Sequence, residues 1–75
     1  MKFAELKAVF AGWRVRIIAL DEERGTTEEE ISLLDTVNAY EKLARYDSAD
    51  VVRFTTGTME HDGEIYPALE VTVRV

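Results

Sequence analysis

The chain has no cysteine, and it has only one proline, one histidine and two serines. Without cysteine it forms neither a disulfide bond nor a thiolate metal site, which fits the reducing cytoplasm where we expect the protein to act. His61, Ser32 and Ser48 do not supply a credible Ser–His–acid triad. No glycine-rich phosphate loop occurs. We therefore expect no enzyme activity and no cofactor.

Long apolar runs are also missing. No segment is long enough to cross a membrane, and charged residues interrupt the apolar stretch of MKFAELKAVF, unlike in a secretory signal. Of the 75 residues, 47% are apolar and 32% are charged, which predicts one small folded domain over residues 1–75. The core of such a domain is modest, so a partner or a second copy would add stability.

Positive charge is scarce. Nine Lys and Arg residues stand against fifteen Asp and Glu residues, which gives a net charge of −6. Residues 1–20 are nevertheless net basic, whereas residues 21–35 hold seven carboxylates and one arginine. A protein that binds DNA or RNA gathers Lys and Arg against phosphate, so the overall balance argues against a nucleic-acid ligand. The uneven charge would orient a charged partner as it approaches.

Two elements are expected near the N-terminus. Phe3, Leu6 and Phe10 recur at helical spacing and predict a short helix over residues 2–11. The segment WRVRIIAL, residues 13–20, alternates between apolar and arginine side chains in its first half, which predicts a strand.

The acidic stretch DEERGTTEEE follows, and Thr27 with Glu30 matches a capping box. This motif predicts a helix that begins near residue 28 and runs to about Tyr46. We expect its buried stripe to consist of Leu33, Val37, Tyr40 and Ala44, with Leu34 on the flank. Three apolar residues would lie outside that stripe, against a loop or a partner: Ile31, Leu43 and Tyr46. Asp21, Glu22 and Glu23 are expected in a solvated loop.

The C-terminal third predicts a β-hairpin. Asp62 and Gly63 lie between two alternating apolar runs, and with a two-residue loop the numbers of facing residues sum to 125. The expected pairs are Val52 with Val73, Phe54 with Val71, Thr56 with Leu69, Arg53 with Thr72 and Thr55 with Glu70. Pro67 lacks a backbone donor, so the strand should be frayed, bulged or unpaired on one side there.

Together these elements predict an α+β domain of helix, strand, helix, strand and strand. We expect a three-stranded antiparallel sheet in the spatial order one, three, two, packed against the long helix. The covered face would consist of Val15, Ile17, Val52, Phe54, Val71 and Val73. The opposite face would carry Arg14, Arg16, Arg53 and Arg74, with Glu70 among them. This arginine-bearing face is either a solvated surface with cross-strand ion pairs or a surface that binds phosphate or an acidic protein.

No metal site is expected. His61 lies beside Glu60, Asp62 and Glu64, but these residues are nearly consecutive on a hairpin turn rather than converging from several elements. The acidic stretch also lacks the alternating ligands and distant glutamate of a calcium-binding loop.

The helix ELKAVF, the strand WRVRII, an acidic helix and a hairpin that ends in VTVRV form a recognisable layout. In size and order of elements the whole chain resembles the small acidic accessory proteins of bacteriophages and mobile elements, which include anti-CRISPR proteins and other inhibitors of host enzymes. The resemblance implies a phage-encoded binding protein in the host cytoplasm. Its acidic surface would occlude the nucleic-acid channel of a host protein.

The leading hypothesis is therefore a non-enzymatic protein-binding domain that docks on a basic surface of a host protein. The carboxylates expected to replace phosphates there are Asp21, Glu22, Glu23, Glu28, Glu29 and Asp35. One alternative is a small structural or oligomerisation module, such as a homodimer joined through an open strand edge or through the arginine-bearing face. Another is a weak nucleic-acid binder that uses this face.

Overall fold

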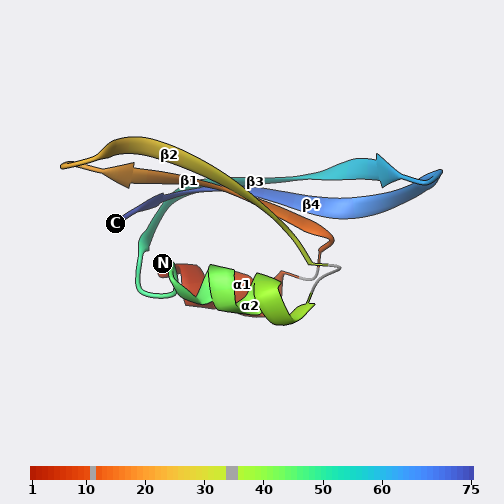
Figure 1. Ribbon diagram of the computed structural model, residues 1–75, viewed down its shortest axis with the longest axis horizontal. Helices are drawn as coiled ribbons and strands as arrows, with labels where there is room; N and C mark the ends of the chain where they lie inside the picture. Colours follow the sequence, from red (N-terminus) through yellow and green to blue (C-terminus); the bar gives the residue numbers. More distant parts are fainter. Residues whose placement is uncertain (11, 34–35) are drawn as a thin grey trace.

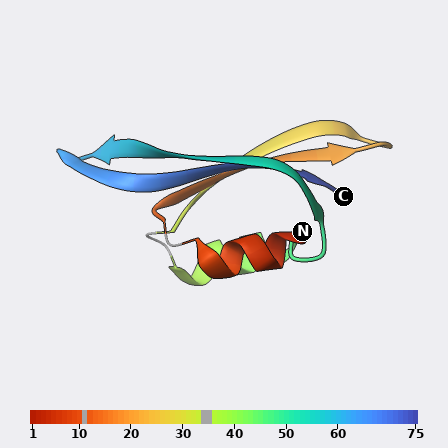
Figure 2. The same ribbon diagram turned by 180° about the vertical axis from the view of Figure 1, so that it is seen from behind.

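The computed structural model describes residues 1–10, 12–33 and 36–75. Within them the elements are α1 (Phe3–Val9), β1 (Arg14–Asp21), β2 (Gly25–Ser32), α2 (Thr36–Ala44), β3 (Asp50–His61) and β4 (Glu64–Arg74). The strands form one sheet, and both helices lie on the same side of it (Figures 1 and 2). The predicted α+β class is confirmed. Among the described residues, no helix has the length and apolar character needed to span a membrane.

The sheet has four strands in the order β2-β1-β4-β3. Its central strands β1 and β4 run parallel, whereas β2 lies antiparallel to β1 and β3 antiparallel to β4. The predicted three-stranded antiparallel sheet is therefore wrong, because β2 adds an edge strand and because β1 and β4 pair in parallel. Parallel neighbours need a crossover connection, which β2, α2 and β3 supply here. The predicted position of the last strand, between the first strand and its hairpin partner, is correct.

The two hairpins project in opposite directions. The turn between β1 and β2 lies at one end of the sheet and the turn between β3 and β4 at the other, with the helices beneath the middle (Figure 1). The molecule is accordingly elongated, with extents of 41 × 20 × 20 Å.

The acidic stretch is a β-hairpin rather than the start of a helix. Asp21 Oδ1 accepts hydrogen bonds from the backbone N–H groups of Glu23 at 2.8 Å and Arg24 at 3.3 Å, and this side chain therefore holds the turn. Gly25 then takes a φ of +82°, which favours glycine. The predicted capping box is wrong, since residues 25–32 form β2 and pair with β1 along their whole length. The predicted long helix to about Tyr46 is wrong as well, because α2 spans only the nine residues Thr36–Ala44.

The buried residues of α2 also differ from the prediction. Leu43 is 1% exposed and Ala39 is 2% exposed, whereas Tyr40 is 60% exposed. Ala44, expected in the stripe, is exposed as well. The predicted stripe is therefore wrong for Tyr40, Leu43 and Ala44, because its helical spacing was counted from Leu33, which precedes α2. Ile31, expected outside the stripe, is buried from β2. Leu34 and the side chain of Val37 lie outside the described part of the chain.

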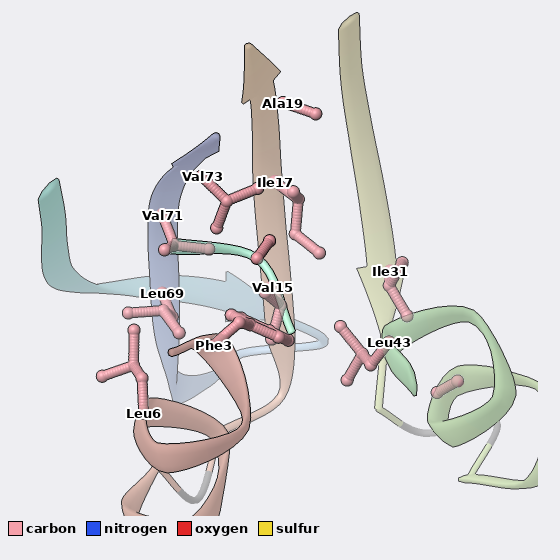
Figure 3. Close-up of a cluster of buried hydrophobic side chains, with 12 residues drawn as sticks. Phe3, Leu6, Val15, Ile17, Ala19, Ile31, Leu43, Leu69, Val71 and Val73 are labelled. Carbon is pink, nitrogen blue, oxygen red and sulfur yellow. The ribbon is translucent and has the colours of Figure 1, made fainter. Parts of the chain in front are cut away.

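The core lies between the helices and the inner face of the sheet (Figure 3). It consists of Phe3, Leu6, Val15, Ile17, Ala19, Ile31, Ala39, Leu43, Ala49, Leu69, Val71 and Val73. Leu6 of α1 lies toward Leu69 of β4, and Leu43 of α2 lies toward Ile31 of β2 (Figure 3). Helix α1 thus covers the β4 side of the sheet, and α2 covers the β2 side. Burial of this apolar surface is the main contribution to the stability of the fold.

The β3–β4 hairpin follows the predicted register from its turn to Arg53. Phe54 faces Val71, Thr56 faces Leu69, Arg53 faces Thr72 and Thr55 faces Glu70. A register shift between Val51 and Arg53 then places Val51, instead of Val52, opposite Val73. Val52 and Phe54 were predicted on the covered face, but they are 46% and 44% exposed, since β3 is the edge strand. The predicted covering of these two residues is wrong.

Pro67 lies in an unbroken part of this hairpin, opposite Thr58. Its carbonyl oxygen accepts a hydrogen bond from the backbone N–H of Trp13 at 2.9 Å. The carbonyl and the nitrogen of one strand residue point to the same side, so the missing donor of Pro67 faces away from β3. The ladder between β3 and β4 therefore loses no hydrogen bond at the proline, and the strand is neither frayed nor bulged there. The third predicted outcome holds, since Pro67 is unpaired on one side: the ladder with β1 begins at Ala68.

Candidate interaction surfaces

The open face of the sheet, opposite the helices, carries the predicted arginines. Arg16 of β1 lies between two carboxylates, with Nη2 2.8 Å from Glu28 Oε2 and Nη1 3.4 Å from Glu70 Oε2. The hydrogen bond to Glu28, the charge of Glu28 and the charge of Glu70 raise the pKa of Arg16. Arg14 Nη1 lies 3.3 Å from Glu30 Oε2 in the same way. Side chains of β2 and β4 thus compensate the positive charges of β1.

The other two arginines also have neighbours on this face. Arg53 Nε donates to Thr72 Oγ1 at 3.4 Å, and Arg74 faces Asp50 in the ladder. Asp50 itself lies 2.7 Å from Lys2 Nζ, and this contact lowers the pKa of the Asp50 carboxyl. The four arginines therefore share a face with acidic partners interspersed, which matches the expected solvated surface with cross-strand ion pairs.

The six predicted carboxylates do not form one surface. Glu28 and Glu29 are consecutive in β2, so their side chains lie on opposite faces of the sheet. Glu28 pairs with Arg16 on the open face. Asp35 lies outside the described residues. Only Asp21, Glu22 and Glu23 stay together, at the turn between β1 and β2.

Glu29 has a structural role that the sequence did not reveal. Its carboxylate accepts hydrogen bonds from Arg45 Nη2 at 2.7 and 2.8 Å and from the Tyr46 hydroxyl at 2.8 Å. These contacts attach β2 to the segment that follows α2. Burial raises the pKa of Tyr46, and the hydrogen bond to Glu29 raises it further. No local pattern marks this cluster, because its members are 16 and 17 residues apart in the chain.

The acidic hairpin end, which we define as Asp21, Glu22 and Glu23, projects from the body of the molecule (Figure 1). The carboxylate of Asp21 accepts the two hydrogen bonds of the turn. Glu22 and Glu23 are exposed and form no ion pair with any residue that the structure describes. These two carboxylates are free to meet a partner.

The opposite hairpin end is acidic as well. It carries Glu60, Asp62 and Glu64 around His61, whose Nε2 lies 3.3 Å from Asp62 Oδ2. The imidazole also stacks on the indole of Trp13 with ring centroids 5.1 Å apart. His61 thus packs against an aromatic side chain that the sequence did not associate with it. Within the described residues, no three His, Asp or Glu side chains gather as a metal site requires.

An aromatic hollow of about 450 Å³ opens beside Trp13. It is lined by Phe10, Gly12, Trp13, Leu33, Tyr40, Tyr66 and Pro67. The Phe10 ring lies so close to Gly12 that any Cβ at that position would collide with it. The buried indole N–H of Trp13 has no hydrogen-bond partner among the described residues. The hollow has the apolar walls of a small-ligand pocket, although nothing in its lining selects one ligand.

The open edge of β3 is a further candidate surface, and it is an edge of the kind that the homodimer alternative requires. All residues of β3 except Val51 and Met59 are exposed. The backbone N–H of Val51 donates to the Met1 carbonyl at 2.8 Å. Beyond Val51, the outer backbone groups of β3 have no partner in the part of the chain that the structure describes. Such an edge is a template for pairing with another strand.

Comparisons with protein-family models, with curated proteins and with solved structures find no match to this chain. A functional assignment therefore depends on the geometry of these surfaces.

Proposed function

We propose that this protein is a non-enzymatic protein-binding domain that presents the acidic hairpin end, Asp21, Glu22 and Glu23, to a basic surface of a partner protein. The observation that supports the proposal is the pair of exposed, unpaired carboxylates at the end of a projecting hairpin. In the form implied by the resemblance, the protein is phage-encoded and the partner is a host protein that handles nucleic acid.

The proposed binding surface is smaller than the set of six carboxylates that the sequence predicts. Glu28 and Glu29 already neutralise Arg16 and Arg45, so binding through them would first require these contacts to break. The acidic hairpin end needs no such rearrangement. Its charges would guide association with a basic surface and favour fast, salt-sensitive binding.

The test is retention of partner proteins from a host lysate at low and high salt. The variant combines Asp21→Asn, Glu22→Gln and Glu23→Gln; the asparagine keeps the oxygen that accepts the turn hydrogen bonds. A matched control combines Glu60→Gln, Asp62→Asn and Glu64→Gln, which removes the same charge from the opposite hairpin end.

We expect the wild type and the control to retain one basic partner at low salt, and the variant to lose it. The wild type should also release the partner as salt is raised. Equal retention by the variant, or binding that withstands high salt, would contradict a role for the acidic hairpin end.

A second candidate function, an oligomerisation module, is favoured by the open edge of β3. A role as a nucleic-acid binder is disfavoured by the carboxylates that compensate Arg14 and Arg16 on the open face. Binding to mixed DNA or RNA at low salt, lost when Arg14 and Arg16 are replaced by glutamine, would restore that role.

A further inference from the structure

We propose that β3 pairs in an antiparallel manner with β3 of a second copy of the chain, centred on Gly57, and so joins the two sheets into one. The inference rests on the second candidate function, oligomerisation, and does not depend on the acidic hairpin end. It names the partner of the open edge and the register in which that partner binds.

The backbone of β3 presents hydrogen-bonding groups to solvent at alternate residues. In a two-residue hairpin the residues that flank the turn exchange both backbone hydrogen bonds, and such pairs recur every second residue. His61 faces Glu64 beside the turn, so the odd-numbered residues from Thr55 to His61 direct their backbone groups toward β4. The backbone groups that point outward, away from β4, belong to Phe54, Thr56, Thr58 and Glu60.

The regular part of the edge is symmetric about one glycine. The register shift interrupts β3 before Arg53, and the turn ends it after His61. Gly57 is the midpoint of this regular segment. Pairing the whole segment with itself about a two-fold axis therefore places Gly57 against Gly57 of the second copy, with the same face of each sheet on the same side.

The facing side chains suit one another in this register. Thr56 meets Thr58 of the second copy, and Thr55 meets Met59, while Phe54 lies along the aliphatic stem of Glu60. Cross-strand threonine pairs stabilise antiparallel neighbours, and in this register no two carboxylates face each other, nor do any two Lys or Arg side chains. The outward backbone groups of the four even-numbered residues then form on the order of eight hydrogen bonds.

Charge also favours a second copy at this edge rather than elsewhere. Each chain carries a net charge of −6, so two copies repel each other in general. Residues 54–59, FTTGTM, contain no charged side chain. The outer half of the β3–β4 hairpin extends past both helices, which leaves this part of the edge clear of them (Figure 2). The edge is thus the place where two acidic chains can approach at low electrostatic cost.

Disulfide trapping tests the register, because the chain has no cysteine of its own. Gly57→Cys introduces a thiol at the two-fold axis, where facing Cα atoms of a non-hydrogen-bonded pair lie about 4.5 Å apart, within disulfide range. A Cβ at Gly57 meets no atom within 4 Å, so the fold accommodates the substitution. Thr55→Cys is the control on the same face, since its two copies lie about 13 Å apart in this register.

Under mild oxidation we expect Gly57→Cys to form a covalent dimer rapidly and Thr55→Cys to remain largely monomeric. Cross-linking of Thr55→Cys at an equal or higher rate overturns pairing centred on Gly57. Absence of cross-linking in both variants overturns it as well.

Sedimentation equilibrium of the wild type supplies an independent readout. We expect a concentration-dependent dimer, and Thr56→Pro should raise its dissociation constant about tenfold or more by removing an outward N–H group at the edge. Thr56→Ala is the matched control, which keeps that group and should dimerise like the wild type. A wild type that stays monomeric at millimolar concentration overturns the proposal.

Circular dichroism of Thr56→Pro checks that the variant is folded, and the cysteine pair decides the question if it is not. The amide variant of Asp21, Glu22 and Glu23 should leave both dimerisation readouts unchanged. The failure of one proposal is therefore distinguishable from the failure of the other.

Discussion

Replacing Leu43 with alanine tests which face of α2 packs against the sheet. Leu43 is 1% exposed and belongs to the core, whereas Tyr40, one turn earlier in the same helix, is 60% exposed. The helical periodicity of the sequence predicted the reverse assignment for these two residues. Alanine has the highest helix propensity, so neither substitution weakens α2 itself. The two variants therefore report on packing.

The expected loss for Leu43→Ala is about 2–5 kcal/mol, because the vacated volume lies between α2 and β2, where the surrounding side chains relax only in part. A 75-residue domain has a free energy of unfolding of about 4–11 kcal/mol. The substitution should thus remove roughly a fifth or more of the total free energy of unfolding. Tyr40→Ala should cost less than about 1 kcal/mol, since most of its side chain is already in water.

Urea unfolding followed by far-UV circular dichroism and by the fluorescence of Trp13 measures both variants. With a urea dependence of about 1 kcal/mol per molar, Leu43→Ala should lower the midpoint by about 2 M or more, and Tyr40→Ala by less than about 1 M. A Tyr40→Ala midpoint as low as that of Leu43→Ala would refute the orientation of α2 and the core built on it.

Gly63 has a φ of +79°, so Gly63→Ala should destabilise the fold by about 1 kcal/mol and lower its melting temperature. Gly57 lacks that constraint, so Gly57→Ala should not lower the melting temperature. The raised pKa of Tyr46 means that its contribution to stability is complete below pH 10 and is lost as the pH rises from there through the folded-state pKa. Tyr46→Phe should therefore flatten the alkaline limb of a stability–pH curve, and an unchanged limb would contradict the assignment. Lys2→Ala should return the lowered pKa of Asp50 toward its ordinary value of 3.8, as a carboxyl titration by NMR would record. In the wild type this carboxylate adds stability above that value and loses it as the pH falls through the folded-state pKa.

The β3–β4 hairpin shows what the sequence could predict. Asp62 has a φ of 51° and Gly63 one of +79°, which are the conformations that an Asp-Gly turn supplies. The alternation on both sides of the turn selects the same register as the turn itself, so two local signals agree. Both are encoded in adjacent residues, and the hairpin was therefore predictable without any tertiary information.

The β2 strand shows where the prediction failed. Its sequence GTTEEEIS has a capping motif and three glutamates, all of which favour the first turn of a helix. In the structure, Glu28 and Glu30 instead form diagonal ion pairs with Arg16 and Arg14 of β1, and Glu29 reaches Arg45 beyond α2. These partners, together with the ladder to β1, outweigh the local preference of this sequence for a helix start, which is about 1 kcal/mol. They come from distant parts of the chain, so periodicity and capping could not reveal them.

The same strand explains why the predicted acidic surface divides. Carboxylates adjacent in the sequence would lie close together on the first turn of a helix, but consecutive residues of a strand lie on opposite faces. Among the described members of the set, the acidic hairpin end alone stays together, because Asp21 folds the chain back on itself there.

The placement of charge separates the two proposed surfaces. Unpaired carboxylates lie at the turn between β1 and β2, whereas the middle of β3 has no charge and its outer backbone is unsatisfied within the described residues. A charged surface gives salt-sensitive association, whereas strand pairing through backbone hydrogen bonds depends little on salt. Dimerisation through β3 should therefore persist at a salt concentration that releases a partner from the acidic hairpin end.

Because the turn between β1 and β2 lies far from the β3 edge, a dimer would present two such ends, and one partner with two basic sites would bind it more tightly than it binds the monomer.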